Sequence, residues 1–350
     1  MDNNKILSER EMLIFLALVT NYINNSEPVG SRTLSKKIDI ELSPASIRNI
    51  MADLEEKGFL THPHTSAGRI PTEKGYRFLV NHIMECLIRE KTKPLISHKN
   101  LESLLIQIRE RAAMLSKISS ILSNLSRYLG VVMAPRVSQL TLKHIDFVHM
   151  GGRQCLAIFV SQSGLVFNRM IKTEEIIHQE QLDKMARYVN HQFEGLNLSE
   201  IKEKIFQIMS DEKTLYDRFI RQSIQMSKDA IDQEGICDVY IDGRLNILDQ
   251  PEFSDPQKMR SFFDTVEEKE RLIKIMDQYQ DETGVKVVIG SENLDPHMKD
   301  CSLVMCPYQI RSQVCGIVGV IGPTRMRYKE VIYTVNQMAA MMTKIFQQMQ

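Results

Sequence analysis

The sequence predicts an α+β protein of several domains that begins with a winged helix-turn-helix. Its 350 residues exceed what one ordinary hydrophobic core accommodates, so we expect two or three domains. Residues 1–84 contain three amphipathic helical patterns, then a polar hairpin pattern and a further helix, which is the plan of a winged helix. From residue 139 onward, strand-like apolar runs alternate with helical patterns, as in an α+β domain.

The first three helices are predicted from their end signals and apolar spacing. A helix is expected over Ser8–Asn25, where the serine is a suitable N-cap and apolar residues recur once per turn. A short second helix is expected over Ser31–Ile38. A third is expected over Ser43–Lys57, because Ser-Pro is a favoured helix start and Gly58 is a favoured residue just past a helix end.

A hairpin is predicted after the third helix. The stretch Thr61–Arg69 is polar and contains glycine, and the apolar pairs Phe59-Leu60 and Ile70-Pro71 flank it. Thr72 is placed to cap the next helix. These elements define an N-terminal domain over residues 1–84.

A hinge and a long helix are expected next. Residues 85–100 are predicted to be a hinge, because the stretch Arg89–Pro94 has no apolar residue to bury and ends in proline. Beyond it, apolar residues from Leu101 to Leu129 follow a heptad spacing that only Arg111 interrupts. This pattern predicts one long amphipathic helix.

The remainder of the chain is predicted to mix strands and helices. Strands are expected over Leu140–Met150, Cys155–Val160, Leu165–Ile171, Cys237–Ile241, Val285–Ile289, Leu303–Pro307 and Val314–Ile321. Helices are expected over His178–Phe193, around Ile201–Ile231 and over Lys329–Met349.

The composition excludes several classes of protein. Lys plus Arg number 44 and Asp plus Glu also number 44, so any binding of nucleic acid must rest on local placement of cations. The six cysteines form no CxxC pair and are expected to be reduced thiols. No apolar run is long enough to span a membrane, and no cleavable signal peptide is recognisable, so we expect a cytoplasmic protein.

The third helix has one apolar face and one face suited to a DNA groove. Its core stripe is Ile47, Ile50, Met51 and Leu54. The residues predicted to contact DNA from this helix are Ser43, Ala45, Ser46, Arg48, Asn49 and Ala52. Alanines let a backbone approach the groove floor, and arginine and asparagine pair bidentately with guanine and adenine edges. Taken alone, an ordinary solvent-exposed helix also explains this pattern.

The hairpin and its flanks supply a second set of candidate DNA contacts. The hairpin holds hydroxyls, histidines and an arginine without an acid, which suits phosphate contact or entry into the minor groove. The predicted contacts are Arg32, His62, His64, Thr65, Ser66, Arg69, Lys74 and Arg77. A generic polar loop is the alternative.

Five segments of the sequence resemble a known family. They are Glu27–Leu34 (EPVGSRTL), Leu42–Asn49 (LSPASIRN), Ser66–Thr72 (SAGRIPT), Gly75–Phe78 (GYRF) and Gly319–Met326 (GVIGPTRM). In this order they resemble the HrcA family of heat-inducible transcription repressors, and the resemblance covers nearly the whole chain.

The resemblance implies a function and a domain plan. It implies a homodimeric negative regulator of heat-shock (chaperone) operons that binds an inverted-repeat operator in double-stranded DNA. It also implies release from the operator on heat shock and assistance by the chaperonin. The family fold implies a GAF-like domain over residues 101–199 and 281–350, interrupted by an inserted dimerising segment at residues 200–280. The heptad helix is the other candidate for the dimer interface.

Patterns typical of enzymes are missing from the sequence. There is no HExxH and no GxSxG, and glycines 316, 319 and 322 match neither GxGxxG nor the P-loop. We therefore expect no catalytic residues, no cofactor and no metal ion. Two alternatives to the repressor remain. One is a regulator that senses a metabolite in a GAF-like pocket, and the other is a scaffold that uses the heptad helix and binds no duplex.

Overall fold

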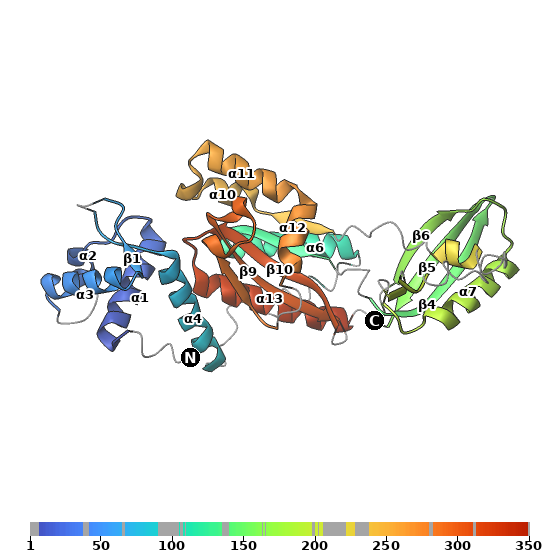
Figure 1. The fold of residues 1–350 in the computed structure, drawn as a ribbon, viewed down its shortest axis with the longest axis horizontal. Helices are drawn as coiled ribbons and strands as arrows, with labels where there is room; N and C mark the ends of the chain where they lie inside the picture. The colour runs from blue at the N-terminus through green and yellow to red at the C-terminus, as the bar shows by residue number, and fades with distance from the viewer. Residues whose placement is uncertain are drawn as a thin grey trace. The chain divides into compact units, whose positions relative to one another are not determined.

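The structure is a computed structural model of mixed α and β elements, as the sequence predicts (Figure 1). It describes residues 7–37, 42–64, 67–89, 105, 108, 110–134, 140–162, 164, 166–197, 200–201, 203–205, 222–227, 238–279, 283–310 and 313–348. Contacts divide the chain into two compact units. Unit 1 comprises residues 1–132, 239–307 and 317–345, and unit 2 comprises residues 133–238, 308–316 and 346–350. Within the described ranges, no helix has the length and hydropathy of a membrane-spanning segment.

Unit 1 begins with the helices and hairpin that the sequence predicts, here called the N-terminal region (residues 7–89). Its elements are α1 (Glu9–Asn25), α2 (Ser31–Lys37), α3 (Pro44–Glu56), β1 (Leu60–Thr61), β2 (Ile70–Pro71) and α4 (Glu73–Arg89). Ser8 forms a capping box with Glu11, and Thr72 caps α4 by accepting from Gly75 N at 3.1 Å. Gly58 has φ +77°, the left-handed conformation that follows a helix end. The local end signals therefore act as predicted.

An aromatic cluster joins the first and last helices of the N-terminal region. Phe15 of α1 lies edge-on to Phe59 and Phe78, with ring centroids 6.0 and 5.4 Å apart. All three rings are buried. Each large side chain removed from water contributes about 1.5–3 kcal/mol. This core holds α3 and the hairpin on a common support.

Most of the rest of unit 1 belongs to a five-stranded sheet with helices around it, here called the sheet region. The strand order is β7-β3-β10-β9-β8. The bounds are β3 (Leu129–Met133), β7 (Val239–Asp242), β8 (Lys286–Ile289), β9 (Cys301–Ile310) and β10 (Gln313–Pro323). The helices are α6 (Arg111–Ser126), α10 (Arg244–Leu248), η4 (Pro251–Phe253), α11 (Pro256–Glu267), α12 (Lys269–Asp277), η5 (Gly290–Glu292), η6 (Pro296–Met298) and α13 (Tyr328–Gln348). The Tyr328 hydroxyl lies 2.7 Å from the Ser302 hydroxyl, which fastens α13 to β9.

Unit 2 contains a separate antiparallel sheet of β4 (Leu142–Gly151), β5 (Gln154–Ser161) and β6 (Val166–Lys172), with α7 (Gln179–Phe193) on one face. Asn190 of α7 clamps β4, because its amide donates to Ile145 O at 2.9 Å and accepts from Ile145 N at 2.7 Å. Ile145 and Phe147 point into the core beneath α7. The strands and helix predicted between residues 140 and 193 are thereby confirmed.

The long heptad helix is a correction. The structure begins α6 at Arg111 and ends it at Ser126, and Leu129 is the first residue of β3. Arg127 has φ +62°, the left-handed conformation that terminates the helix. Residues Leu101 and Leu104 lie outside the described ranges. The run Leu129–Met133 is fully buried in the sheet, and strand pairing there overrides the heptad spacing.

The contact-defined units and the expected domains are different divisions of the chain, and the expected domain limits stay a prediction. Residues 133–199 belong to unit 2 and residues 239–280 to unit 1, whereas the GAF-like domain was expected at 101–199 and 281–350 and the insertion at 200–280. Strands β4–β6 and α7 form a compact unit because they bury their apolar residues against each other in a separate core. Of the helical segment expected around Ile201–Ile231, Ile201, Ile205 and Ile224 join that core, and most of the rest lies outside the described residues.

Candidate nucleic-acid interface

The exposed face of α3 consists of the residues that the sequence predicts. Ala45, Arg48, Asn49 and Ala52 are all exposed, and Ile47, Met51 and Leu54 are buried beneath them. Ile50, predicted as part of the core stripe, is half-buried. Over its first two turns, this face therefore carries small side chains, an arginine and an asparagine, and no acidic side chain.

Ser43 and Ser46 form the cap of α3. The Ser43 hydroxyl accepts from Ser46 N at 3.1 Å and lies 3.0 Å from the Ser46 hydroxyl. The two serines are therefore engaged with each other at the helix start. Because the N-terminal end of a helix carries a partial positive charge, this end also attracts phosphate oxygens.

α2 adds positive charge beside α3. Leu34 is buried between the two helices, while Arg32, Lys36 and Lys37 are exposed on α2. The helix sequence SRTLSKK contains no acid. In a chain of net charge zero, this short helix and Arg48 concentrate cations on one part of the N-terminal region.

The base of the hairpin is tied to the turn before α2. Val29 and Arg69 exchange two backbone hydrogen bonds, each 2.9 Å long. Gly68 makes this approach possible, because a Cβ there would lie 2.5 Å from the Val29 backbone. The hairpin is thus pinned at its base. Its predicted contact residues Thr65 and Ser66 lie outside the described ranges.

Arg69 and His62 of the hairpin are paired with α3 rather than free. Glu55 Oε2 lies 2.6 Å from Arg69 Nε, within ion-pair distance although not aligned for a hydrogen bond, and Glu55 Oε1 contacts His62 Nδ1. His64 is exposed. Glu55 is not among the site residues predicted from the sequence, although its place near the end of α3, next to a cationic hairpin, is a signal that points to it.

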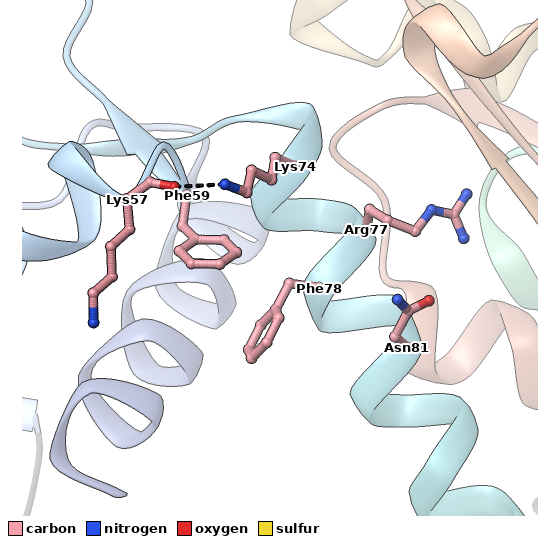
Figure 2. A pocket seen from close by; sticks show the side chains of 6 residues that line it. All are labelled: Lys57, Phe59, Lys74, Arg77, Phe78 and Asn81. Carbon is pink, nitrogen blue, oxygen red and sulfur yellow. Dashed lines mark hydrogen bonds between the residues drawn. The ribbon is translucent and has the colours of Figure 1, made fainter. Parts of the chain in front are cut away.

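Lys74 and Arg77, also predicted to contact DNA, are engaged within unit 1. Lys74 Nζ donates to Lys57 O at 2.7 Å and lies 4.8 Å from the centroid of the Phe59 ring (Figure 2). These residues line a basin of about 500 Å³ with Phe78 and Asn81. Arg77 donates to Glu292 and to Val287 O of the sheet region. The structure thus separates these two cations from the α2–α3 surface.

A further ion pair joins the ends of α1 and α3. Lys57 Nζ lies 2.6 Å from Glu11 Oε1. Hydrogen bonds from Lys57 and from Ser8 lower the pKa of the Glu11 carboxyl below its ordinary value. This carboxylate both caps α1 and fixes the C-terminal end of α3. In the described part of the chain, no group of three His, Cys, Asp or Glu side chains is placed to hold a metal ion.

Comparison with known sequences places the chain in a family. Residues 112–332 match the family described as HrcA protein C terminal domain. The heat-inducible transcription repressor HrcA of Geobacter sulfurreducens is 38% identical over 342 residues, which cover 97% of this chain and 98% of that protein. The repressor of the same name from Syntrophobacter fumaroxidans is 38% identical over 345 residues and covers 98% of each chain.

Comparison with solved structures supports the fold. A crystal structure of a hypothetical protein superposes with a TM-score of 0.61, covering 98% of this chain and 100% of that chain at 21% identity. The family match and the identity over nearly the full chain agree with each other. The chain belongs to the HrcA family of heat-inducible transcription repressors.

Proposed function

We propose that this chain represses heat-shock (chaperone) operons by binding an inverted-repeat operator in double-stranded DNA as a homodimer. In this proposal the N-terminal region is a winged helix-turn-helix and α3 is its recognition helix. The exposed face of α3, with Ala45, Arg48, Asn49 and Ala52 beside the cations of α2, is the observation that carries the proposal.

The chemistry of that face suits the major groove. Arg48 can donate two hydrogen bonds to guanine, and Asn49 can pair bidentately with adenine. Ala45 and Ala52 allow close approach of the backbone and contact with thymine methyl groups. Arg32, Lys36 and Lys37 supply contacts to phosphates, which position the helix and make affinity depend on salt.

A gel-shift titration with two pairs of variants tests this role. Asn49→Ala and Arg48→Ala are each expected to weaken specific binding by about 1–3 kcal/mol, with the fold unchanged. The matched controls are Asn24→Ala and Arg10→Ala, which remove the same side chains from exposed positions of α1. If Asn49→Ala weakens binding to unrelated duplex as much as binding to the operator, Asn49 does not contact a base edge.

We infer that the homodimer forms through unit 2. The sheet face away from α7 carries the exposed apolar residues Val148, Met150, Val166 and Met170, with exposures of 37–50%. They share one face, because Val148 and Met170 both pair with Leu156 of β5. A second copy of the chain is the occupant that an inverted repeat requires, since each half-site needs its own recognition helix.

Sedimentation of a doubly substituted chain tests this interface. Val148→Lys with Met170→Lys is expected to give a folded monomer with much weaker operator binding. Glu180→Lys is the control, because it lies exposed on α7, which covers the opposite face of the sheet. A stable dimer of the double variant would move the interface to the segment expected at residues 200–280 or to the heptad segment, where Leu125 of α6 is exposed.

The proposal includes release by heat and assistance by the chaperonin. α13 buries Met338, Met341 and Met342 on one face. Methionine is unbranched and flexible, so such a core is adaptable and loosely specified. A core of marginal stability supports a repressor that fails on warming and requires a chaperone to regain its active form.

A metabolite-sensing regulator is the second candidate, and a cleft favours it. The cleft has a volume of about 660 Å³ and is lined by residues of α1, α4 and α13 that include Leu16, Ile83 and Tyr333. A ligand that binds only the folded chain raises its melting temperature. A thermal-shift screen with a metabolite set is expected to show no stabilisation if the chain is a pure heat-responsive repressor, and a clear shift by one compound favours sensing.

A further inference from the structure

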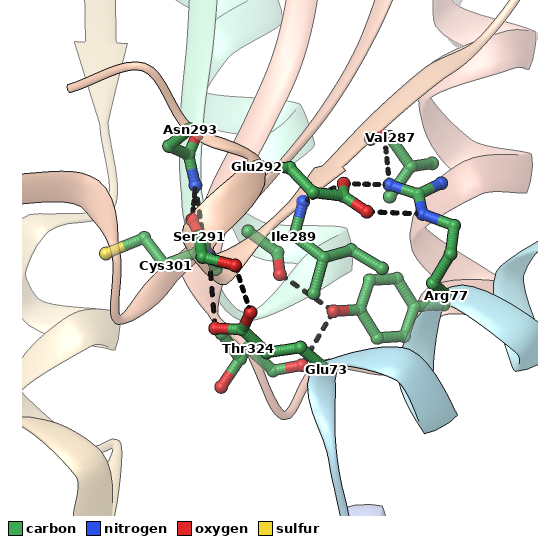
Figure 3. Close-up of polar contacts among 12 residues, drawn as sticks. Glu73, Arg77, Val287, Ile289, Ser291, Glu292, Asn293, Cys301 and Thr324 are labelled. Atoms are coloured by element: carbon green, nitrogen blue, oxygen red, sulfur yellow. Dashed lines mark hydrogen bonds and ion pairs between the residues drawn. The ribbon is translucent and has the colours of Figure 1, made fainter. Parts of the chain in front are cut away.

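Two side chains of α4 form hydrogen bonds with one turn of the sheet region. Glu73 and Arg77 lie one helical turn apart, and both point toward η5 (Gly290–Glu292), as Figure 3 shows. Ser291 N donates to Glu73 Oε1 at 3.1 Å, and the Ser291 hydroxyl donates to Oε2. Arg77 Nε donates to Glu292 Oε1 at 2.7 Å and Nη2 to Oε2. These four residues are called the clasp.

The clasp is shaped for close approach. Gly290 has φ +53°, and a Cβ there would lie 2.0 Å from Glu73 Oε1. Glu292 is held by its own turn, because its Oε2 also accepts from Ile289 N at 2.8 Å. Arg77 Nη2 reaches past the turn to Val287 O of β8 at 2.8 Å. Arg77 and Glu292 therefore each have two bond partners, which fix their places in the clasp.

A second attachment holds α1. Arg325, which is 7% exposed, donates to Ile23 O near the C-terminal end of α1 at 2.5 Å. Its Nε and Nη2 donate to the Glu252 carboxylate at 2.5 and 3.2 Å. The buried rings of Tyr76 and Tyr328 lie between helices of the two regions, with centroids 5.8 Å apart.

These attachments remove the freedom of a hinge. A single contact would let the N-terminal region rotate, but the clasp and Arg325 engage two different helices, α4 and α1. With both in place, the orientation of α3 relative to the sheet region is fixed. In a dimer that binds an inverted repeat, freedom of each recognition helix on the rest of its chain weakens the preference for one half-site spacing, and these attachments remove the freedom between α3 and the sheet region.

We propose that Arg77 and Glu292 are positioning residues that select the operator's half-site spacing, and this proposal rests on the proposed function. Arg77 acts by holding α4 against η5 and contacts no base. Avidity of a two-headed binder is lost when geometry prevents both heads from binding at once. Breaking the clasp therefore weakens binding to the correct spacing and relaxes discrimination against other spacings.

The test uses the full chain and three variants: Arg77→Glu, Glu292→Arg and the double exchange Arg77→Glu/Glu292→Arg. The operator is first selected by the wild-type chain from random-sequence duplexes. Binding is then titrated on that operator, on a version with its half-sites moved apart by about half a helical turn, and on a single half-site. Circular dichroism checks that each variant is folded.

Each single variant is expected to bind the selected operator about tenfold more weakly while half-site affinity changes less than about twofold. Its preference for the selected spacing over the shifted one falls correspondingly, and the double exchange restores most of that preference. The inference is overturned if folded single variants keep the wild-type preference for the selected spacing. It is also overturned if a variant loses as much affinity for the single half-site as for the full operator. If the wild-type chain selects no inverted repeat, the proposed function itself fails.

Discussion

Glu55 Oε2, near the C-terminal end of α3, lies 2.6 Å from Arg69 Nε at the base of the hairpin. The same carboxylate contacts His62 on the other arm. One acid therefore holds both arms of the hairpin against the helix proposed to enter the groove. A carboxylate near DNA repels the phosphates and so opposes binding. Here we expect the Glu55 carboxylate to favour binding, because it positions the hairpin.

The first prediction follows from this contact. Glu55→Gln is expected to weaken operator binding severalfold, because the hairpin loses its fixed position. The free energy of unfolding is expected to change by no more than about 1 kcal/mol. The control is Glu56→Gln, an exposed neighbour on α3 that removes the same charge. Loss of a negative charge alone strengthens binding to phosphate. If both variants bind equally or more tightly than the wild type, Glu55 does not position the hairpin.

The second prediction concerns the backbone approach at the hairpin base. Gly68→Ala is expected to destabilise the chain by about 1–3 kcal/mol, because its Cβ would clash with the Val29 backbone. Gly30→Ala is the matched control, since the nearest atom to its Cβ, Thr33 Oγ1, is 4.0 Å away. Urea unfolding measures both. Equal stability of the two variants would show that the backbone at the hairpin base can shift to accommodate the Cβ without loss of folding free energy.

The third prediction is a pH dependence of the Glu11–Lys57 pair. The folded-state pKa of Glu11 is lowered, so its contribution is fully present above the unfolded-state pKa of about 4.3 and is lost as pH falls through the folded-state value. Glu11→Gln keeps the capping geometry and removes the charge. Wild type is expected to be more stable than this variant by roughly 0.2–1 kcal/mol at neutral pH.

Urea titrations at neutral pH and at about pH 3, well below that unfolded-state pKa, measure this difference. It should be smaller at the acidic pH, because more of the Glu11 carboxyl is then protonated in the folded state. Glu9→Gln serves as control, because Glu9 is exposed in the same first turn of α1. A wild-type advantage that persists unchanged into acid contradicts the assignment to Glu11.

The fourth prediction concerns heat. The purified chain is expected to begin unfolding or aggregating only slightly above growth temperature, because its methionine-rich core is loosely specified. Chaperonin with ATP is expected to restore operator binding to heated protein. Scattering and gel-shift assays on the same heated samples follow both events. Full operator occupancy well above growth temperature without chaperonin would rule out heat release by loss of the folded state.

The sequence predicted the elements of the N-terminal region well because their signals are local. Ser8, Ser43 and Thr72 cap the helices that follow them, and Gly58 lies just past α3 as expected. The groove-facing set on α3 follows from helical periodicity alone, so its exposure was also predictable. Whether that face contacts DNA stays a prediction.

Long-range partners account for what sequence patterns missed. The sequence predicts a DNA contact for Arg77 because this residue follows the hairpin, but Glu292, its partner in the structure, is 215 residues away in the sequence. The sequence likewise predicts a DNA contact for Arg69, because no local pattern indicates that Glu55 turns toward its guanidinium. The heptad pattern does not reveal the strand β3, because an apolar run such as Leu129–Met133 suits a buried helix as well as a buried strand.

The topology of the five-stranded sheet has a consequence for the order in which the chain folds. β3 and β7 are neighbours in the sheet, yet residues 134–238 separate them, and Ala134 N donates to Asp238 O at 2.8 Å where the chain leaves and returns. The β4–β6 meander lies within those intervening residues and pairs strands that follow one another in the sequence, so it can form early and shorten the loop that β7 must close. Until it does, β3 presents an unpaired apolar edge. Such an edge aggregates readily, so the chain is most prone to aggregation in the interval before this loop closes.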